Sequence, residues 1–186
     1  MRQLWVAKML VVVLGVVMLG MGCSAVYTVD PVGHTPLDIS RESGEWAGLW
    51  QHNDGVISVV VKDASNGVLE IGWVDHDDNG MKLLAGEVFL RTIEGSTFAS
   101  LRMHDGEDEA KGLLWGRIQR RGKTVLVWSP DKSEFESRVE AGAFPGTTNG
   151  SDLVLGALDT NHLGLIAGED ALFEWKEPLV FWKTSD

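Results

Sequence analysis

Short apolar runs, separated by glycine-containing turns, fill the chain between residues 45 and 129. The runs are rich in Val, Ile, Leu and Trp, and polar residues interrupt them at short intervals, which is typical of β-strands. The breaks carry pairs such as Asn66-Gly67 and Asn79-Gly80, which favour hairpin turns. We therefore predict seven strands, at residues 45–52, 56–63, 67–75, 81–93, 97–104, 112–119 and 123–129.

The spacing of these strands indicates how they are connected. Strands that follow one another every ~10–15 residues suit an antiparallel meander, and such a meander can close on itself as a barrel. Four glycines, Gly48, Gly72, Gly86 and Gly116, fall inside the predicted strands. Glycine within a strand permits the bends that a small barrel needs, although these positions could also be ordinary weak points of the strands.

The rest of the chain mixes helical and strand patterns. Ser133 and Glu136 have the spacing of a capping box, although the pair Ser129-Pro130 could start the same helix one turn earlier. Phe135 and Val139 would then lie on one face of that helix. The other predicted elements are a loop at 143–152, a strand at 153–158, a helix at 161–172 and a final strand at 178–183.

The first 22 residues have the layout of a secretory signal. Arg2 and Lys8 make a short positive start, and an apolar run of about 14 residues follows. This run is shorter than the ~20 residues that span a bilayer as a helix. It ends at Cys23, the only cysteine of the chain.

The sequence Leu19-Gly20-Met21-Gly22-Cys23 resembles the lipobox of bacterial lipoproteins, although Gly20 stands where that family prefers Leu. The resemblance implies that Cys23 is lipidated and becomes the mature N-terminus, and that its acyl chains hold the protein on a membrane. Ser24 is not the Asp that retains such lipoproteins in the inner membrane, so the resemblance implies the outer membrane, with a periplasmic domain. The alternatives are an uncleaved membrane anchor and a secreted protein that is cut elsewhere.

These features predict three regions in the chain. Residues 1–22 are a signal peptide, and residues 23–44, with two prolines and little periodicity, are the lipidated cysteine and a flexible tether. Residues 45–186 form a single β-barrel-like domain. If Cys23 is lipidated, no intrachain disulfide can form, and the core must be held by packing alone.

The charge of the chain excludes one class of partner. It carries 16 Lys and Arg against 27 Asp and Glu, a formal net charge of −11. No basic cluster is present that could neutralise phosphates, so we expect no binding to nucleic acid.

Histidines stand beside acidic residues in three of the predicted turns. Alternate turns of a meander lie at one end, which gathers the segments 51–54, 75–79 and 104–109 at an acidic mouth. Imidazole suits zinc or copper and carboxylates suit calcium, which makes His52, Asp75, Asp77 and His104 candidate metal ligands. Residues 75–80 also match the start of an EF-hand loop, but Gly86 stands where that loop needs Glu. The alternative is a set of solvated polar turns.

The segment Gly44-Glu45-Trp46 resembles the opening motif of bacterial lipocalins, in which an aromatic residue usually follows the Trp; here it is Ala47. The resemblance implies a lipocalin-like barrel that binds lipids or other hydrophobic ligands. Together with the helical patterns, it predicts a mainly β fold, an antiparallel meander that closes as a lipocalin-like barrel with one or two short helices near the C-terminus, although a lipocalin has only one helix and one strand in this region. The residues that could line such a pocket are Trp46, Trp50, Trp73, Trp115 and Trp128. They could equally be ordinary core residues of a filled barrel.

Motifs for catalysis are missing from the sequence. It contains no Gly-x-Ser-x-Gly, no nucleophilic cysteine and no His-Glu-x-x-His, so we expect no enzyme and no cofactor, and a hydrolase is the least favoured function. The sequence favours a non-enzymatic binding protein for a hydrophobic ligand. The alternative is an envelope protein with a filled barrel that binds or assembles other proteins.

Overall fold

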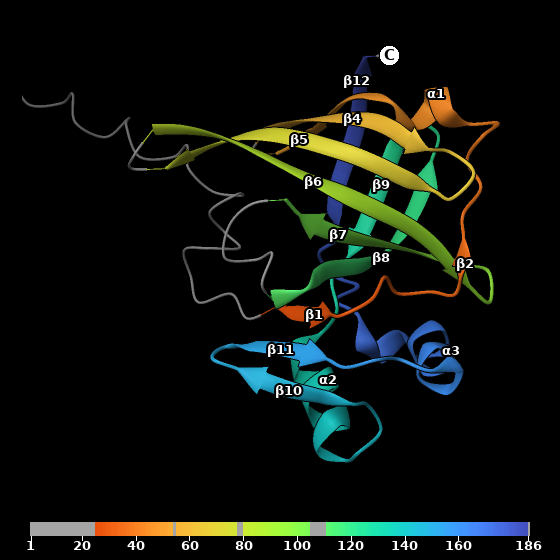
Figure 1. Cartoon of the computed structure of the whole chain (residues 1–186), viewed down its shortest axis with the longest axis vertical. Coiled ribbons are helices and arrows are strands. Elements are labelled where there is room, and N and C mark those ends of the chain that lie inside the picture. The colour runs from red at the N-terminus through yellow and green to blue at the C-terminus, as the bar shows by residue number, and fades with distance from the viewer. Residues whose placement is uncertain (1–24, 54, 78–79, 105–110, 186) are drawn as a thin grey trace, which may run out of the picture.

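A computed structural model of the chain describes residues 25–53, 55–77, 80–104 and 111–185 (Figure 1). Its strands are β1 Val26–Thr28, β2 Thr35–Pro36, β3 Gly48–His52, β4 Gly55–Asp63, β5 Val68–Asp77, β6 Gly80–Ile93, β7 Ser96–Met103, β8 Leu113–Arg121, β9 Thr124–Trp128, β10 Gly146–Asn149, β11 Asp152–Leu155 and β12 Leu179–Ser185. Its helices are α1 Ser43–Trp46, α2 Lys132–Glu140, α3 Thr160–Gly168 and the 3₁₀ turn η2 Asp170–Leu172. Along the described residues, none of these helices is long and apolar enough to cross a membrane.

The main architecture is a closed antiparallel barrel of eight strands, as the sequence predicted. Strands β3 to β9 follow one another as a meander, and three of its described turns contain a glycine with positive φ, which are Gly67, Gly95 and Gly122. The last strand, β12, then inserts between β9 and β3, pairing Trp182 with Thr124 on one side and with Gln51 on the other. The lipocalin-like fold class, with two short helices near the C-terminus, is confirmed.

Residues 25–44, which were expected to belong to a flexible tether, are part of the folded domain. β1 pairs in parallel with β11 and antiparallel with β8, and β2 pairs with β6. Val26, Val32 and Ile39 are almost completely buried. The predicted domain boundary at residue 45 is therefore wrong, because strands of two or three residues show no periodicity and are held by partners that are distant in sequence.

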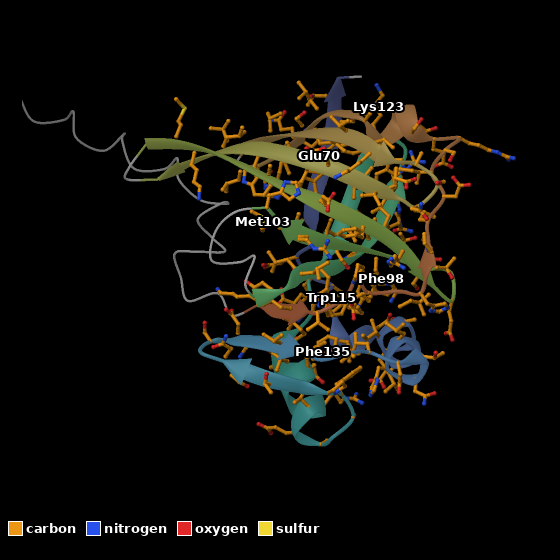
Figure 2. All side chains as sticks on the ribbon, in the orientation of Figure 1. Glu70, Phe98, Met103, Trp115, Lys123 and Phe135 are labelled. Atoms are coloured by element: carbon orange, nitrogen blue, oxygen red, sulfur yellow. The ribbon has the colours of Figure 1, made fainter. Side chains whose placement is uncertain are left out.

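Apolar side chains form two cores, one on each side of the β7–β8 wall. Inside the barrel the buried residues include Trp50, Leu69, Leu90, Ile118 and Val125. Outside it, helices α2 and α3 with β10 and β11 form a second layer below the barrel (Figure 1). Figure 2 shows Phe98, Trp115 and Phe135 in succession from the barrel wall to α2, and all three are buried.

Several local predictions need correction. Helix α2 is capped by Asp131, which accepts from the backbone N–H groups of Ser133 and Glu134, so the Ser133–Glu136 capping box is wrong. The segment predicted as a loop contains β10, and the last predicted helix ends at Gly168 before η2. Both errors arise where glycines and polar residues hide a short element that long-range packing stabilises.

Candidate functional site: the barrel interior

The short helix α1 covers one end of the barrel. Trp46 is buried and lies on this helix. The prediction that Trp46 lies on a strand is therefore wrong. The indole N–H of Trp50, on the first barrel strand, donates to the carbonyl oxygen of Trp46 at 2.8 Å. From the last strand, the buried Lys183 ammonium donates to the carbonyl oxygen of Gly44 at 2.6 Å. These contacts fix α1 over this end of the barrel, which we call the closed end. A pocket of about 430 Å³ lies beside it, lined in part by Trp46, Ile118 and Arg120.

The half of the barrel next to α1 is filled with side chains. Trp50, Leu69, Leu90 and Ile118 point inward here and are almost completely buried. Because successive side chains of a strand point to opposite faces, these residues also define which positions of each strand face inward.

The opposite half of the barrel has inward-facing apolar side chains that are only partly buried. By the alternation of β4 and β5, Ile57, Ile71 and Trp73 face the interior, and each keeps part of its surface accessible. The same holds for three residues on β6, β7 and β8, which are Leu84, Leu101 and Leu114. We call these six residues the apolar mouth. An apolar lining that remains accessible can bury a hydrophobic molecule without displacing protein side chains.

Two of the five tryptophans proposed for ligand binding lie elsewhere. Trp115 faces outward from β8 and packs edge-on against Phe135 and Phe173 in the outer core. Trp128 also faces outward and packs against Trp175 in a tilted arrangement, with ring centres 4.9 Å apart. Neither lines the barrel interior, whereas Trp46 and Trp50 contribute to its closed end and Trp73 to the apolar mouth.

The described strand ends that flank the three polar turns lie at the same end of the barrel, because these turns connect β3 to β4, β5 to β6 and β7 to β8. His52, however, is buried, with its ring centre 5.0 Å from that of Phe181, while His104 is exposed. The side chains of Asp75 and Asp77 lie outside the described part. Within the part of the chain that the structure describes, no three His, Cys, Asp or Glu side chains form a group that could hold a metal ion.

Sequence reasoning missed an apolar surface on the outside of β4, β5 and β6. The large side chains exposed there are Val56, Val60, Val74, Met81 and Leu83, which we call the outer apolar face. Val74 pairs directly with Leu83, which is 73% exposed. The available signal was the uninterrupted run of valines at 59–61, which places Val59 and Val61 on the inner face of β4 and leaves Val60 on the outer face.

Three charged side chains near this face, Lys62, Glu87 and Arg102, interact with one another. Lys62 donates to Glu87, and this contact, more than any other, holds the pKa of Glu87 below its usual value. Arg102 lies near the same carboxylate and over the ring of Phe89, 4.9 Å from its centre. These pairs lie on the outer surface, so they do not bring a charge into the apolar mouth.

Comparison of the chain with protein-family models, with curated proteins and with solved structures found no match.

Proposed function

We propose that this protein is a lipid-anchored lipoprotein of the outer membrane whose barrel binds a hydrophobic ligand without catalysing a reaction. The observation that carries the binding function is the apolar mouth, where six inward-facing side chains are partly accessible while the α1 end is packed. A closed end and an accessible apolar end are what a barrel needs to hold one elongated apolar molecule.

The start of the folded domain would give the proposed anchor an orientation. The backbone N–H of Ala25 donates to Asp152, and the same carboxylate pairs with Lys111, the residue that leads into β8 from the mouth end. Figure 1 also shows β1 beginning on the side where the β5–β6 hairpin projects. Cys23 precedes Ala25 by two residues, which span at most ~7 Å. An acylated Cys23 would therefore hold the mouth close to the membrane.

The charge of the protein limits the proposed ligand to a neutral molecule. The described residues of the apolar mouth are all uncharged, and the polar turns at this end are acidic in sequence. A carboxylate or phosphate headgroup would be repelled there, whereas a neutral acylglycerol would not.

A quenching experiment tests this binding function. A monoacylglycerol brominated along its acyl chain should quench Trp73, because bromine quenches indole fluorescence only at short range. We expect saturable quenching of the wild type that is greatly reduced in Trp73→Phe and retained in Trp175→Phe, whose side chain lies outside the barrel. Equal quenching of both variants, or none of the wild type, would contradict the proposal.

The anchor has its own test. In cells fed a radiolabelled fatty acid, Cys23→Ser should remain an unlabelled precursor, because the thiol is the proposed acyl acceptor. Normal acyl labelling of this variant would rule out the lipoprotein assignment without affecting ligand binding.

A second candidate function, binding to another envelope protein, is favoured by the outer apolar face. Met81 is 80% exposed and Val74 60%, and the surrounding protein is acidic. The partner that fits is a protein with an apolar patch bordered by basic residues. A photo-crosslinker at position 83 should capture one such protein, and their purified complex should weaken with salt. A crosslinker at the exposed Thr148 on β10 should capture none; equal capture from both positions would exclude this interface.

A further inference from the structure

A cavity of about 320 Å³ lies outside the barrel, between β6, the segment that leads into β2, and the start of α3. Its lining residues include Asp30, His34, Arg91, Leu158 and Leu163. Arg91 pairs with Phe98 of the neighbouring strand, and Phe98 belongs to the outer core. The cavity is therefore on the opposite side of the barrel wall from the apolar mouth, and it is independent of the proposed ligand site.

Arg91 supplies an unpaired positive charge to this cavity. Its Nε atom is buried and has no hydrogen-bond partner, and none of the described residues pairs with its guanidinium. By contrast, Arg120 and Arg138 each pair with at least one carboxylate. In a chain with 27 acidic and 16 basic residues, a half-buried arginine without a carboxylate partner is unexpected, because buried polar groups are nearly always hydrogen-bonded.

The surrounding backbone holds Arg91 in place. A Cβ atom at Gly33 would come within 2.7 Å of the Arg91 Cβ, so only glycine lets the loop pack this closely on the base of the arginine side chain. The next residues pair with the same strand, with Pro36 opposite Arg91. These contacts preorganise the base of the side chain, while the guanidinium remains available.

The other walls define which ligand would fit. Leu158 and Leu163 are apolar and at least partly buried, and His34 is exposed beside them. Asp30 places a negative charge on the same cavity, which disfavours a dianion such as phosphate more than a monoanion. A guanidinium binds a carboxylate through two parallel hydrogen bonds.

We propose that this cavity binds a small monocarboxylate, with the carboxylate on Arg91 and a short apolar chain against Leu158 and Leu163. The volume is at the lower end of the range of small-molecule sites, about 300–1,000 Å³, and suits a ligand the size of hexanoate.

Titration with hexanoate, followed by NMR of the Leu158 and Leu163 methyl groups and by calorimetry, tests the proposal. We expect saturable binding of hexanoate to the wild type. Arg91→Gln should lower the affinity at least ~10-fold, because the loss of one charged hydrogen bond lowers affinity by about that factor. Arg91→Lys should restore part of the affinity. Arg102→Gln is the matched control, because Arg102 lies on the outer surface over Phe89, and it should bind hexanoate as the wild type does.

Two further measurements separate the carboxylate from other causes. Asp30→Asn should tighten hexanoate binding, because it removes a repelling charge from the cavity. Hexanol, with the same chain and no charge, should bind at least ~10-fold more weakly than hexanoate. The proposal is overturned if hexanoate does not bind, if hexanol binds equally well, or if Arg91→Gln keeps the wild-type affinity.

Discussion

The guanidinium of Arg120 lies over the ring of Trp46, 5.4 Å from its centre, and joins strand β8 of the meander to the helix α1 that covers the end of the barrel. The same guanidinium pairs with Glu42 at 2.5 Å and with Glu45. A single residue of β8 thus makes three contacts with α1 and with Glu42, the residue before it. The buried Lys183 on β12 holds the same segment at Gly44.

Replacing Arg120 by Ala should loosen this closed end. The ion pairs involve exposed carboxylates and contribute little, whereas the contact with Trp46 is largely desolvated. We expect the free energy of unfolding to fall by about 1–2 kcal/mol. Urea denaturation of the variant measures this loss. Arg121→Ala, an exposed neighbour, should change stability by less than about 0.5 kcal/mol, and equal losses in the two variants would contradict the role of Arg120.

Gly86 and Gly72 form a matched pair for testing where the barrel needs glycine. A Cβ at Gly86 would approach the Arg102 carbonyl oxygen to 2.6 Å, whereas at Gly72 the nearest atom is 3.7 Å away. Gly86→Ala should therefore cost about 1–3 kcal/mol. Gly72→Ala should be neutral or stabilise by up to about 1 kcal/mol, because it restricts the unfolded chain. Thermal melts of both variants check this, and the reverse order would be inconsistent with the strand packing described.

The N-terminal segment should be needed for folding. A chain beginning at Glu45 lacks β1 and β2, and it lacks Val26, Val32 and Ile39, which fill parts of both cores. We expect it to melt at a clearly lower temperature than a chain beginning at Ser24, or to bind the dye anilinonaphthalene sulfonate as partly folded proteins do. Equal melting temperatures would show that residues 24–44 are a tether after all.

Helix α2 should lose its cap in acid. The pKa of Asp131 lies below its usual value, mainly because the Ser133 hydroxyl donates a hydrogen bond to the Asp131 carboxylate. The backbone N–H groups of Glu134 and Ser133 lower this pKa further. A lowered pKa in the folded state means that the charge stabilises the fold at neutral pH and that this contribution disappears as pH falls below about 4.

Asp131→Asn keeps a capping oxygen but cannot ionise. The wild type should therefore be more stable than this variant at pH 7, and the difference should shrink as pH falls through the lowered pKa of Asp131. Asp131→Ala should cost about 1 kcal/mol at pH 7. A difference between wild type and Asp131→Asn that grows on acidification would contradict the assigned cause.

The sequence predicted the meander well, because its signals are local. From the glycine-containing turns and apolar runs, the boundaries of β4 to β9 were predicted to within about two residues of those in the structure. Elements with a strong local pattern are the ones whose position is easiest to predict. The insertion of β12 between β9 and β3 was not predictable from local pattern, since its pairing with β3 joins residues that are more than a hundred positions apart. The fold of residues 25–44 was missed for the same reason.

The site was less predictable than the fold. Trp73 and Trp115 both stand on strands with apolar neighbours, but one faces the barrel interior and the other the outer core. Alternation alone cannot distinguish the two faces where a second layer covers the outside of the barrel. The unpaired state of Arg91 depends on what surrounds it in space, and no sequence pattern reports that.

The most direct test of the proposed binding function is to locate the ligand by NMR. With a ¹³C-methyl-labelled protein and a neutral monoacylglycerol, we expect nuclear Overhauser effects between the acyl chain and the methyl groups of Ile57, Ile71 and Leu114. These groups face the barrel interior and are partly accessible. Effects confined to Val74 and Leu83 on the outer apolar face, or no effects at saturating ligand, would contradict binding inside the barrel.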